Sequence, residues 1–215
     1  MTRIALITGA SRGLGAALAL ALAGSHHVIA VARTEGGLEE LDDRIRAAGG
    51  SATLAPMDVA DPQAMAHLCA SIHARWGHLD LWAHTAVHAA PLSPAAHTDA
   101  KDWTRSVALN VTATGILIPL IEPLLGAAPA GQALFFDDPR AGQKFFGAYG
   151  ATKAAQIALA RSWQAETARF ALRVHVLGPA PMQTATRARF FPGEDRSRLA
   201  DPLAEARRLL ASLPA

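Results

Sequence analysis

Two side chains in the second half of the chain could carry out proton transfer. Tyr149 and Lys153 are four residues apart in a stretch with helical periodicity, so both project from one helix face. A phenol is a poor acid or base near neutrality, but a neighbouring ammonium group favours the phenolate and lowers the phenol pKa. Such a pair can exchange a proton with a hydroxyl or carbonyl group. Tyr149 is the only tyrosine in the chain, although a helix with one aromatic residue and one solvated lysine would have the same spacing.

A glycine-rich turn over residues 9–15 lies near the N-terminus. The apolar run 4–7 is typical of a buried parallel strand, and residues 13–20 open a helix. Glycines allow main-chain N–H groups to approach a pyrophosphate, and a helix N-terminus adds free N–H donors and a positive dipole end. The spacing is G-x-x-x-G-x-G instead of the standard G-x-G-x-x-G, and a merely structural turn is the alternative. The position between strand and helix favours a dinucleotide site.

Two arginines indicate which dinucleotide is bound. The second predicted strand, residues 26–32, ends at Arg33, where a carboxylate would bind a ribose 2′-hydroxyl and a basic residue would accommodate a 2′-phosphate. No carboxylate stands there, and Arg12 in the glycine turn is a second cation. Solvated surface arginines are the alternative, but together Arg12 and Arg33 favour NADP(H) over NAD.

The elements that must position these residues alternate along the chain. We expect strands over 4–7, 26–32, 52–56, 79–83, 132–136 and 172–177, and the intervening segments have helical patterns, including 101–125 and 147–170. Asp61 followed by Pro62 predicts a helix start. This alternation requires right-handed crossovers, so it predicts a doubly wound α/β domain with about six parallel strands and helices on both faces.

Composition limits the class of protein. The chain has 215 residues, 51% of them hydrophobic, which predicts one domain over 1–215, with a substrate loop and C-terminal helix segment at 181–213. No uninterrupted apolar run reaches membrane-spanning length, and the first strand begins too early for a signal segment. The single cysteine, Cys69, predicts no internal disulfide and favours a reducing cytoplasm. The 20 basic and 18 acidic residues give no nucleic-acid footprint, and the histidine spacing gives no metal site.

Several motifs, taken in order, resemble the short-chain dehydrogenase/reductase family. They are Thr8-Gly9-Ala10-Ser11-Arg12-Gly13-Leu14-Gly15, Asp58-Val59, Asn110 and Tyr149-Gly150-Ala151-Thr152-Lys153. The match covers residues 1 to about 185. Its tail, residues 179–184 and 187–195, resembles a bacterial subgroup of poorly defined substrate. The resemblance implies a Rossmann fold and hydride transfer between NADP(H) and a carbonyl or alcohol substrate.

The resemblance also implies roles for individual residues. Tyr149 would donate a proton to the carbonyl, Lys153 would bind the nicotinamide ribose and lower the tyrosine pKa, and Asn110 would hold a relay water. The implied cofactor-binding residues are Gly9, Ser11, Arg12, Gly13, Leu14, Arg33, Asp58, Val59, Tyr149, Lys153, Pro179 and Thr184. In the family, the helices around Asn110 and Lys153 form a dimer face, which implies a homo-oligomer.

The chain also departs from the family pattern. The family's Asn-Asn-Ala-Gly falls on residues 84–87, His-Thr-Ala-Val, and its Pro-Gly falls on Pro-Ala at 179–180. Family members usually continue into a seventh strand, whereas residues 199–210 have the pattern of one amphipathic helix.

The main departure concerns the serine that binds the substrate carbonyl. Depending on the direction of counting, it falls on Phe136, Asp137 or Asp138, and we place Asp137 with the catalytic residues. An ionised carboxylate cannot donate a hydrogen bond and would raise the tyrosine pKa, whereas a protonated one could donate. The sequence therefore leaves two functions open: an NADP(H)-dependent oxidoreductase with an altered site, or a non-catalytic NADP(H)-binding protein used for sensing or assembly.

Overall fold

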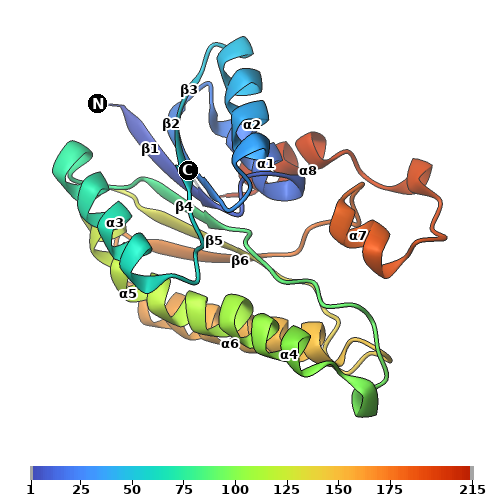
Figure 1. Cartoon of the computed structure of the whole chain (residues 1–215). Coiled ribbons are helices and arrows are strands. Elements are labelled where there is room, and N and C mark those ends of the chain that lie inside the picture. Colours follow the sequence, from blue (N-terminus) through green and yellow to red (C-terminus); the bar gives the residue numbers. More distant parts are fainter. Residues whose placement is uncertain (1, 214–215) are drawn as a thin grey trace.

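One parallel sheet forms the centre of the molecule. The computed structural model describes residues 2–213. Its six strands lie in the order β3-β2-β1-β4-β5-β6 (Figure 1). They are β1 Arg3–Thr8, β2 His26–Ala32, β3 Ser51–Pro56, β4 Leu81–His84, β5 Gln132–Phe136 and β6 Arg173–Leu177. The strand order reverses between β1 and β4, and ligands of such sheets bind at the carboxyl edge beside this switch point. The predicted doubly wound fold is confirmed.

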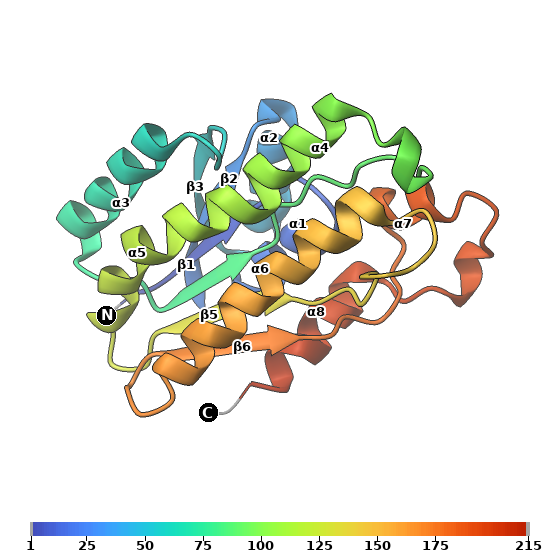
Figure 2. The ribbon, with the colours of Figure 1, turned by 90° about the horizontal axis from the view of Figure 1, so that it is seen from below.

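Helices cover both faces of the sheet. They are α1 Gly13–Leu22, α2 Glu35–Ala47, α3 Pro62–Trp76, α4 Ala100–Ser106, α5 Ala113–Gly126, α6 Gly147–Glu166, α7 Ala185–Phe190 and α8 Pro202–Ala211. Helices α3 to α6 lie on one face and α1, α2 and α8 on the other (Figures 1 and 2). The short helix α7 lies beyond the carboxyl edge of the sheet (Figure 1).

The core has two layers because side chains alternate across each strand. Ile4 and Leu6 of β1 belong to the apolar layer with α3, α5 and α6. Ala5 and Ile7 of the same strand belong to the layer with α1, α2 and α8. All four are fully buried. A strand buried on both faces must be apolar throughout, which explains the continuous run that the sequence shows.

Local sequence signals set both ends of α3. The Asp61 side chain accepts hydrogen bonds from the main-chain N–H groups of Gln63 (2.9 Å) and Ala64 (3.1 Å), so it caps α3 as predicted. The helix ends at Gly77, whose φ of 76° lies in the left-handed region that glycine favours.

Other boundaries differ from the expectations. The continuous helix expected over 101–125 is interrupted by a π-helical turn, Val107–Thr112, between α4 and α5. Strand β4 begins at Leu81 instead of residue 79, because the N–H of Leu79 bonds to the Leu124 carbonyl of α5. The helix expected over 199–210 is α8, which begins later because Asp201 caps it.

The run Ala100–Gly126 comprises α4, the π-helical turn and α5. Among the residues that the structure describes, it is long and apolar enough to cross a membrane by length and composition. Its residues Leu117, Ile121 and Leu125 are buried in the core layer with α3 and α6. In this fold the run therefore packs its apolar side chains against the sheet, as one of the helices that cover it. Cys69, on α3, is buried in the same layer as expected.

Candidate active site

A cavity of about 630 Å³ opens at the carboxyl edge of the sheet. It is lined by the glycine turn, the ends of β2, β4, β5 and β6, the start of α6, and α7. The structure brings all the predicted cofactor-binding residues and Asp137 to this cavity. Asn110 instead is fully buried in the π-helical turn. The individual roles of these residues stay predictions.

The glycine turn forms a cradle that larger residues would fill. Gly9 has a φ of 90°, and a Cβ there would lie 2.6 Å from the main-chain nitrogen of Ala86. A Cβ on Gly15 would clash with the carbonyl of Gly9. Within residues 2–213, no side-chain hydrogen bond caps the N-terminus of α1. Its first N–H groups are thus available to an anion, and this cradle fits a pyrophosphate.

Polar side chains at the end of β4 contact the end of β1 and the start of the glycine turn. Thr85 donates to the carbonyl of Thr8 (2.8 Å), and its hydroxyl lies 3.2 Å from the carbonyl of Gly9. His84 Nδ1 lies 2.8 Å from Thr8 Oγ1. The family's two amides are absent here, but a hydroxyl and an imidazole tie the end of β4 to that of β1.

Arg33 and Asp58 meet at the opposite end of the cavity, where β2 and β3 finish. Arg33 Nη1 lies 3.7 Å from Asp58 Oδ2, and the arginine side chain is 66% exposed. The other carboxylate oxygen of Asp58 accepts from the N–H of Ala60 (2.9 Å). An exposed ion pair of this length is weak, so the guanidinium can turn to a phosphate.

Tyr149 donates its hydroxyl hydrogen to Asp138, not to Asp137. The Tyr149 Oη to Asp138 Oδ2 distance is 3.1 Å, and Arg140 Nε binds the other oxygen of Asp138 at 2.9 Å. Asp137 instead pairs with Arg161 of α6 (3.2 Å). The carboxylate in contact with the tyrosine is thus the neighbour of the residue that we placed in the catalytic group.

Burial raises the pKa of Tyr149 well above its ordinary value, and the charge of Asp138 and the hydrogen bond to it raise it further. The shift is opposite to the lowering expected from Lys153, and the nearby charge that does lower this pKa is that of Arg140. Burial lowers the pKa of Lys153 itself to about 8, against the opposing attraction of Asp138 and Asp137. At neutral pH Tyr149 is consequently a neutral phenol and Lys153 is still mostly an ammonium group, so the two do not form a phenolate–ammonium pair.

Lys153 heads a buried chain of hydrogen bonds. Its Nζ donates to Gln156 Oε1 (2.7 Å), and Gln156 Nε2 donates to Thr114 Oγ1 (3.0 Å). Thr114 Oγ1 also lies 3.1 Å from His84 Nε2. Burial, and then the charge of Lys153, lowers the pKa of His84 to about 3, so its imidazole is neutral. One tautomer, with the hydrogen on Nε2, satisfies both His84 contacts.

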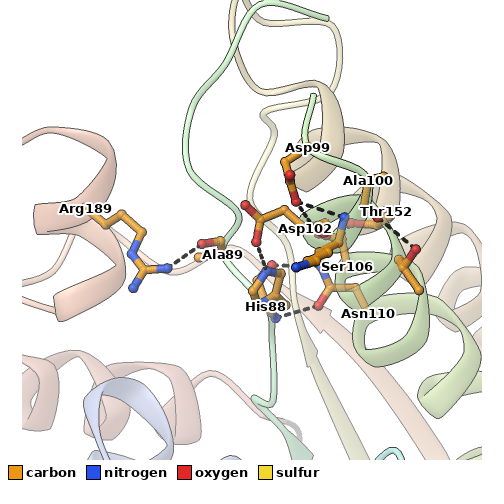
Figure 3. A network of polar contacts seen from close by, with 11 residues as sticks. His88, Ala89, Asp99, Ala100, Asp102, Ser106, Asn110, Thr152 and Arg189 are labelled. Carbon is orange, nitrogen blue, oxygen red and sulfur yellow. Dashed lines mark hydrogen bonds and ion pairs between the residues drawn. The ribbon is translucent and has the colours of Figure 1, made fainter. Parts of the chain in front are cut away.

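Asn110 fastens the loop that follows β4. Its Oδ1 accepts from the His88 N–H (2.7 Å), and its Nδ2 donates to the His88 carbonyl (3.1 Å) and to Thr152 Oγ1 of α6 (2.9 Å). His88 Nε2 lies 3.3 Å from Asp102 Oδ1 (Figure 3). Placing the amide in a π-helical turn aims it at both partners, and such turns are frequent at functional sites. Its expected role in holding a water stays a prediction.

Comparison with known proteins now decides the family. Residues 3–195 match the short chain dehydrogenase family. The chain belongs to this family. It is 28% identical to the cis-4-hydroxycyclohexanecarboxylate dehydrogenase of Sinomonas cyclohexanicum, over 98% of this chain and 89% of that protein. It is 32% identical to an uncharacterized oxidoreductase of Mycobacterium tuberculosis, over 71% of this chain and 59% of that relative.

A solved structure gives the likeness in three dimensions. The short chain dehydrogenase of Escherichia coli crystallised with NADPH superposes with a TM-score of 0.87 at 30% identity. The superposition covers 94% of this chain and 86% of that one. Short-chain dehydrogenases with this architecture thus include an NADPH-bound relative.

Helix α7 covers the tyrosine in this short-chain dehydrogenase. The Phe190 ring centroid lies 4.8 Å from that of Tyr149 and 5.1 Å from that of Phe146, and Tyr149 is only 5% exposed. Arg189 donates to the Ala89 carbonyl (2.8 Å), which joins α7 to the loop after β4 (Figure 3). Arg187 forms a two-pronged ion pair with Glu194.

Sequence reasoning did not assign these contacts. The aromatic and basic residues of 187–195 were visible as a motif, but nothing in their spacing indicated which would face Tyr149. The chain Lys153–Gln156–Thr114–His84 was also missed, because its members come from three separate elements. Among residues 2–213, no group of three or more His, Cys, Asp or Glu side chains could hold a metal ion.

Proposed function

We propose that this protein is an NADP(H)-dependent oxidoreductase that transfers a hydride between the nicotinamide and a carbonyl or alcohol carbon. The observation that carries the proposal is one shared cavity. Tyr149 and Lys153, from adjacent turns of α6, line the same space as the glycine cradle and the two arginines of the cofactor end. Geometry of this kind serves proton transfer beside a bound dinucleotide.

Different residues of the chain would bind different parts of the cofactor. The turn formed by Gly9, Ser11, Arg12, Gly13 and Leu14 would hold the pyrophosphate, with the free N–H groups of α1. Arg33, with Arg12, would bind the 2′-phosphate, and Asp58 and Val59 would meet the adenine. Pro179 and Thr184 would border the nicotinamide, with Lys153 on its ribose. When bound, the dihydronicotinamide supplies a hydride.

Tyr149 would hold the proton that the substrate oxygen takes up. To donate it, the hydroxyl must turn from Asp138 Oδ2, 3.1 Å away, to the substrate. This exchange is the altered feature of the site, because the carboxylate competes with the substrate for the same hydrogen. Asn110 would support the loop and α6 on either side of the tyrosine.

A second function deserves a test because of the same carboxylate. A protein in which Tyr149 remains hydrogen-bonded to Asp138 would bind NADP(H) without turnover and act as a sensor or assembly partner. The relative named as a dehydrogenase and the NADPH-bound structure support the enzyme. We further propose a small-molecule substrate, a cytoplasmic location and a homo-oligomer, with no nucleic-acid or membrane partner.

Cofactor choice provides the first experiment. NADPH should bind more tightly than NADH in titration calorimetry, and Arg33→Ala should narrow the difference by about tenfold or more, because a charge-assisted pair to the phosphate is lost. Arg44→Ala, on the exposed side of α2, is the matched control and should leave both affinities unchanged. Equal affinities in the unmutated protein would refute the NADP(H) assignment.

Turnover then separates the two functions. NADPH consumption, followed by absorbance, should occur with members of a broad carbonyl panel and should fall by at least about a hundredfold in Tyr149→Phe. Tight NADPH binding without turnover of any panel member would favour the non-catalytic protein instead.

A further inference from the structure

The Asp138 carboxylate accepts the hydrogen bond of the Tyr149 hydroxyl. Asp138 follows β5, and its two oxygens have different partners: Oδ1 receives the Arg140 Nε–H (2.9 Å), and Oδ2 receives the Tyr149 hydroxyl (3.1 Å). The ion pair with Arg140, both side chains being largely shielded, stabilises the negative charge. A substrate atom that reaches Tyr149 Oη therefore also meets a carboxylate that can accept but not donate.

A neutral carbonyl group is poorly matched to this arrangement. Its oxygen needs donors, and the hydroxyl beside it is already bound to Asp138. If Tyr149 turns to the carbonyl, Oδ2 of Asp138 loses its donor in a half-buried place, which costs free energy. If Tyr149 does not turn, the carbonyl oxygen stays unpaired.

We propose that the reacting group of the preferred substrate is a protonated imine, a C=N⁺–H, whose N–H donates to Asp138 Oδ2. This inference rests on the proposed function and names its substrate class. A hydride from the dihydronicotinamide forms one C–H bond, and the π electrons of C=N become the nitrogen lone pair. The substrate cation becomes a neutral amine and the cofactor is oxidised, so the step balances without a proton from Tyr149.

The charged groups that face Asp138 are compatible with a cationic substrate. Arg140 occupies the other carboxylate oxygen, and Arg187 is neutralised by its two-pronged pair with Glu194. Lys153, the third cation, is held by Gln156 within α6. The rings of Phe146 and Phe190 flank Tyr149, and aromatic faces attract cations.

Binding without turnover gives the first test. Tetrahydroisoquinoline, protonated near neutrality, and the neutral alcohol tetralol have similar size and differ in charge. Calorimetry with the cofactor-free protein and with its NADPH complex, in which neither compound can react, should show the ammonium binding about tenfold or more tightly than the alcohol. In Asp138→Asn that preference should disappear, whereas Glu166→Gln, an exposed carboxylate at the end of α6, should retain it.

Turnover with matched substrates gives the second test. Protonated dihydroisoquinoline should have a kcat/KM at least about tenfold above that of tetralone, and the pair pyrroline and cyclopentanone should give the same order for a smaller ring. The N-methyl dihydroisoquinolinium ion carries the charge but lacks the N–H, so it should fall between the imine and the ketone. Asp138→Asn should lower the ratio of the imine to the ketone kcat/KM by about tenfold or more. Circular dichroism and unchanged NADPH affinity would show that the variant is folded.

The outcomes are distinct. Faster ketone than imine turnover, with no ammonium preference in calorimetry, would overturn the substrate class and leave the oxidoreductase function intact. No turnover of either class, in a protein that binds NADPH tightly, would overturn both the function and this inference. An imine preference that survives Asp138→Asn would show that another group selects the substrate, and would also overturn the assignment.

Discussion

Tyr149 is subject to opposing electrostatic influences. Lys153 would favour the phenolate, but burial and the carboxylate of Asp138 act in the other direction and raise the pKa. The reason is geometric: Asp138 touches the hydroxyl, whereas the ammonium group of Lys153 is bound to Gln156. Replacing this one carboxylate should therefore change the proton chemistry more than any other substitution nearby.

Ketone reduction should accordingly depend on the side chain at position 138. The Asp138 carboxylate holds the Tyr149 hydroxyl hydrogen, whereas a serine would leave that hydroxyl free and add a second donor. Asp138→Ser should therefore keep or raise the rate of ketone reduction. Steady-state rates of both proteins on an activated ketone measure this. A rate that is abolished by the serine would identify the carboxylate as a base or cation ligand.

Lys153 should make folding stability depend on pH. Burial lowers its pKa from 10.5 to about 8, so between these values the unfolded chain binds more protons than the folded one. The lysine's contribution to the free energy of unfolding should thus rise as pH increases from about 8 to 10, and be lost as pH falls through 8. The full effect is on the order of 3 kcal/mol.

Urea unfolding at pH 7 and pH 10 tests this point. The difference in unfolding free energy between the unmutated protein and Lys153→Met should shift in favour of the lysine protein at the higher pH. Lys101→Met, on the exposed surface of α4, should give a difference that does not move with pH. An unchanged difference for Lys153→Met would mean that the buried amine keeps its ordinary pKa.

The residues of the site were predictable to different degrees. Tyr149, Lys153 and the glycine turn could be found because each lies at a fixed spacing within, or directly beside, a regular element. The choice between Asp137 and Asp138 could not, since both follow β5 in irregular backbone. In such backbone a shift of one residue changes which side chain points inward. Which carboxylate does so here also depends on the ion pairs that Asp137 makes with Arg161 and Asp138 with Arg140.

At the scale of elements, polar side chains join the sheet to the covering helices. Thr114 of α5 receives Gln156 Nε2 from α6, lies beside His84 Nε2 from β4, and donates to the Asn110 carbonyl (3.1 Å). All of these groups are buried. A junction of this kind fixes α6, and with it Lys153, relative to the strand ends.

Thr114→Val should show how much this junction contributes. The valine has nearly the same shape but leaves a buried amide and an imidazole N–H without a partner, which should lower the free energy of unfolding by about 1–3 kcal/mol. Urea denaturation measures the change. Thr104→Val provides the control, because Thr104 also donates to a carbonyl one turn earlier but is exposed on α4. A loss no larger than that of the control would mean that water or repacking satisfies these groups.

Strand and helix positions followed from the sequence, whereas their ends depended on tertiary contacts. Strands β2 and β5 have the bounds that the sequence predicted, because a strand buried on both faces must be apolar along its whole length. The π-helical turn between α4 and α5 had no sequence signal. It depends on contacts of Asn110 with His88 and Thr152, which come from segments distant in sequence.

For the whole molecule, the open question is self-association. On α6, which belongs to the dimer face that the family resemblance implies, Ile157 and Trp163 are each 3% exposed and pack in the core. The outer surface of this layer carries other apolar groups: Leu159 of α6 is 38% exposed and Trp103 of α4 45%. Helices α4 and α5 follow each other end to end there, and α6 runs beside them (Figure 2). Exposed apolar side chains on adjacent helices favour a two-fold interface.

Light scattering at micromolar concentration should therefore report an oligomer, and Leu159→Glu should convert it to a monomer. The substitution places a charge in the apolar centre of the interface, where it would be desolvated without a partner. Because Leu159 is exposed in the single chain, the variant should keep its fold and its NADPH affinity. Phe170→Glu is the matched control: this residue is 63% exposed beyond the end of α6, so its replacement should leave the oligomer intact. A monomer in the unmutated protein, or an oligomer that survives Leu159→Glu, would place any interface elsewhere.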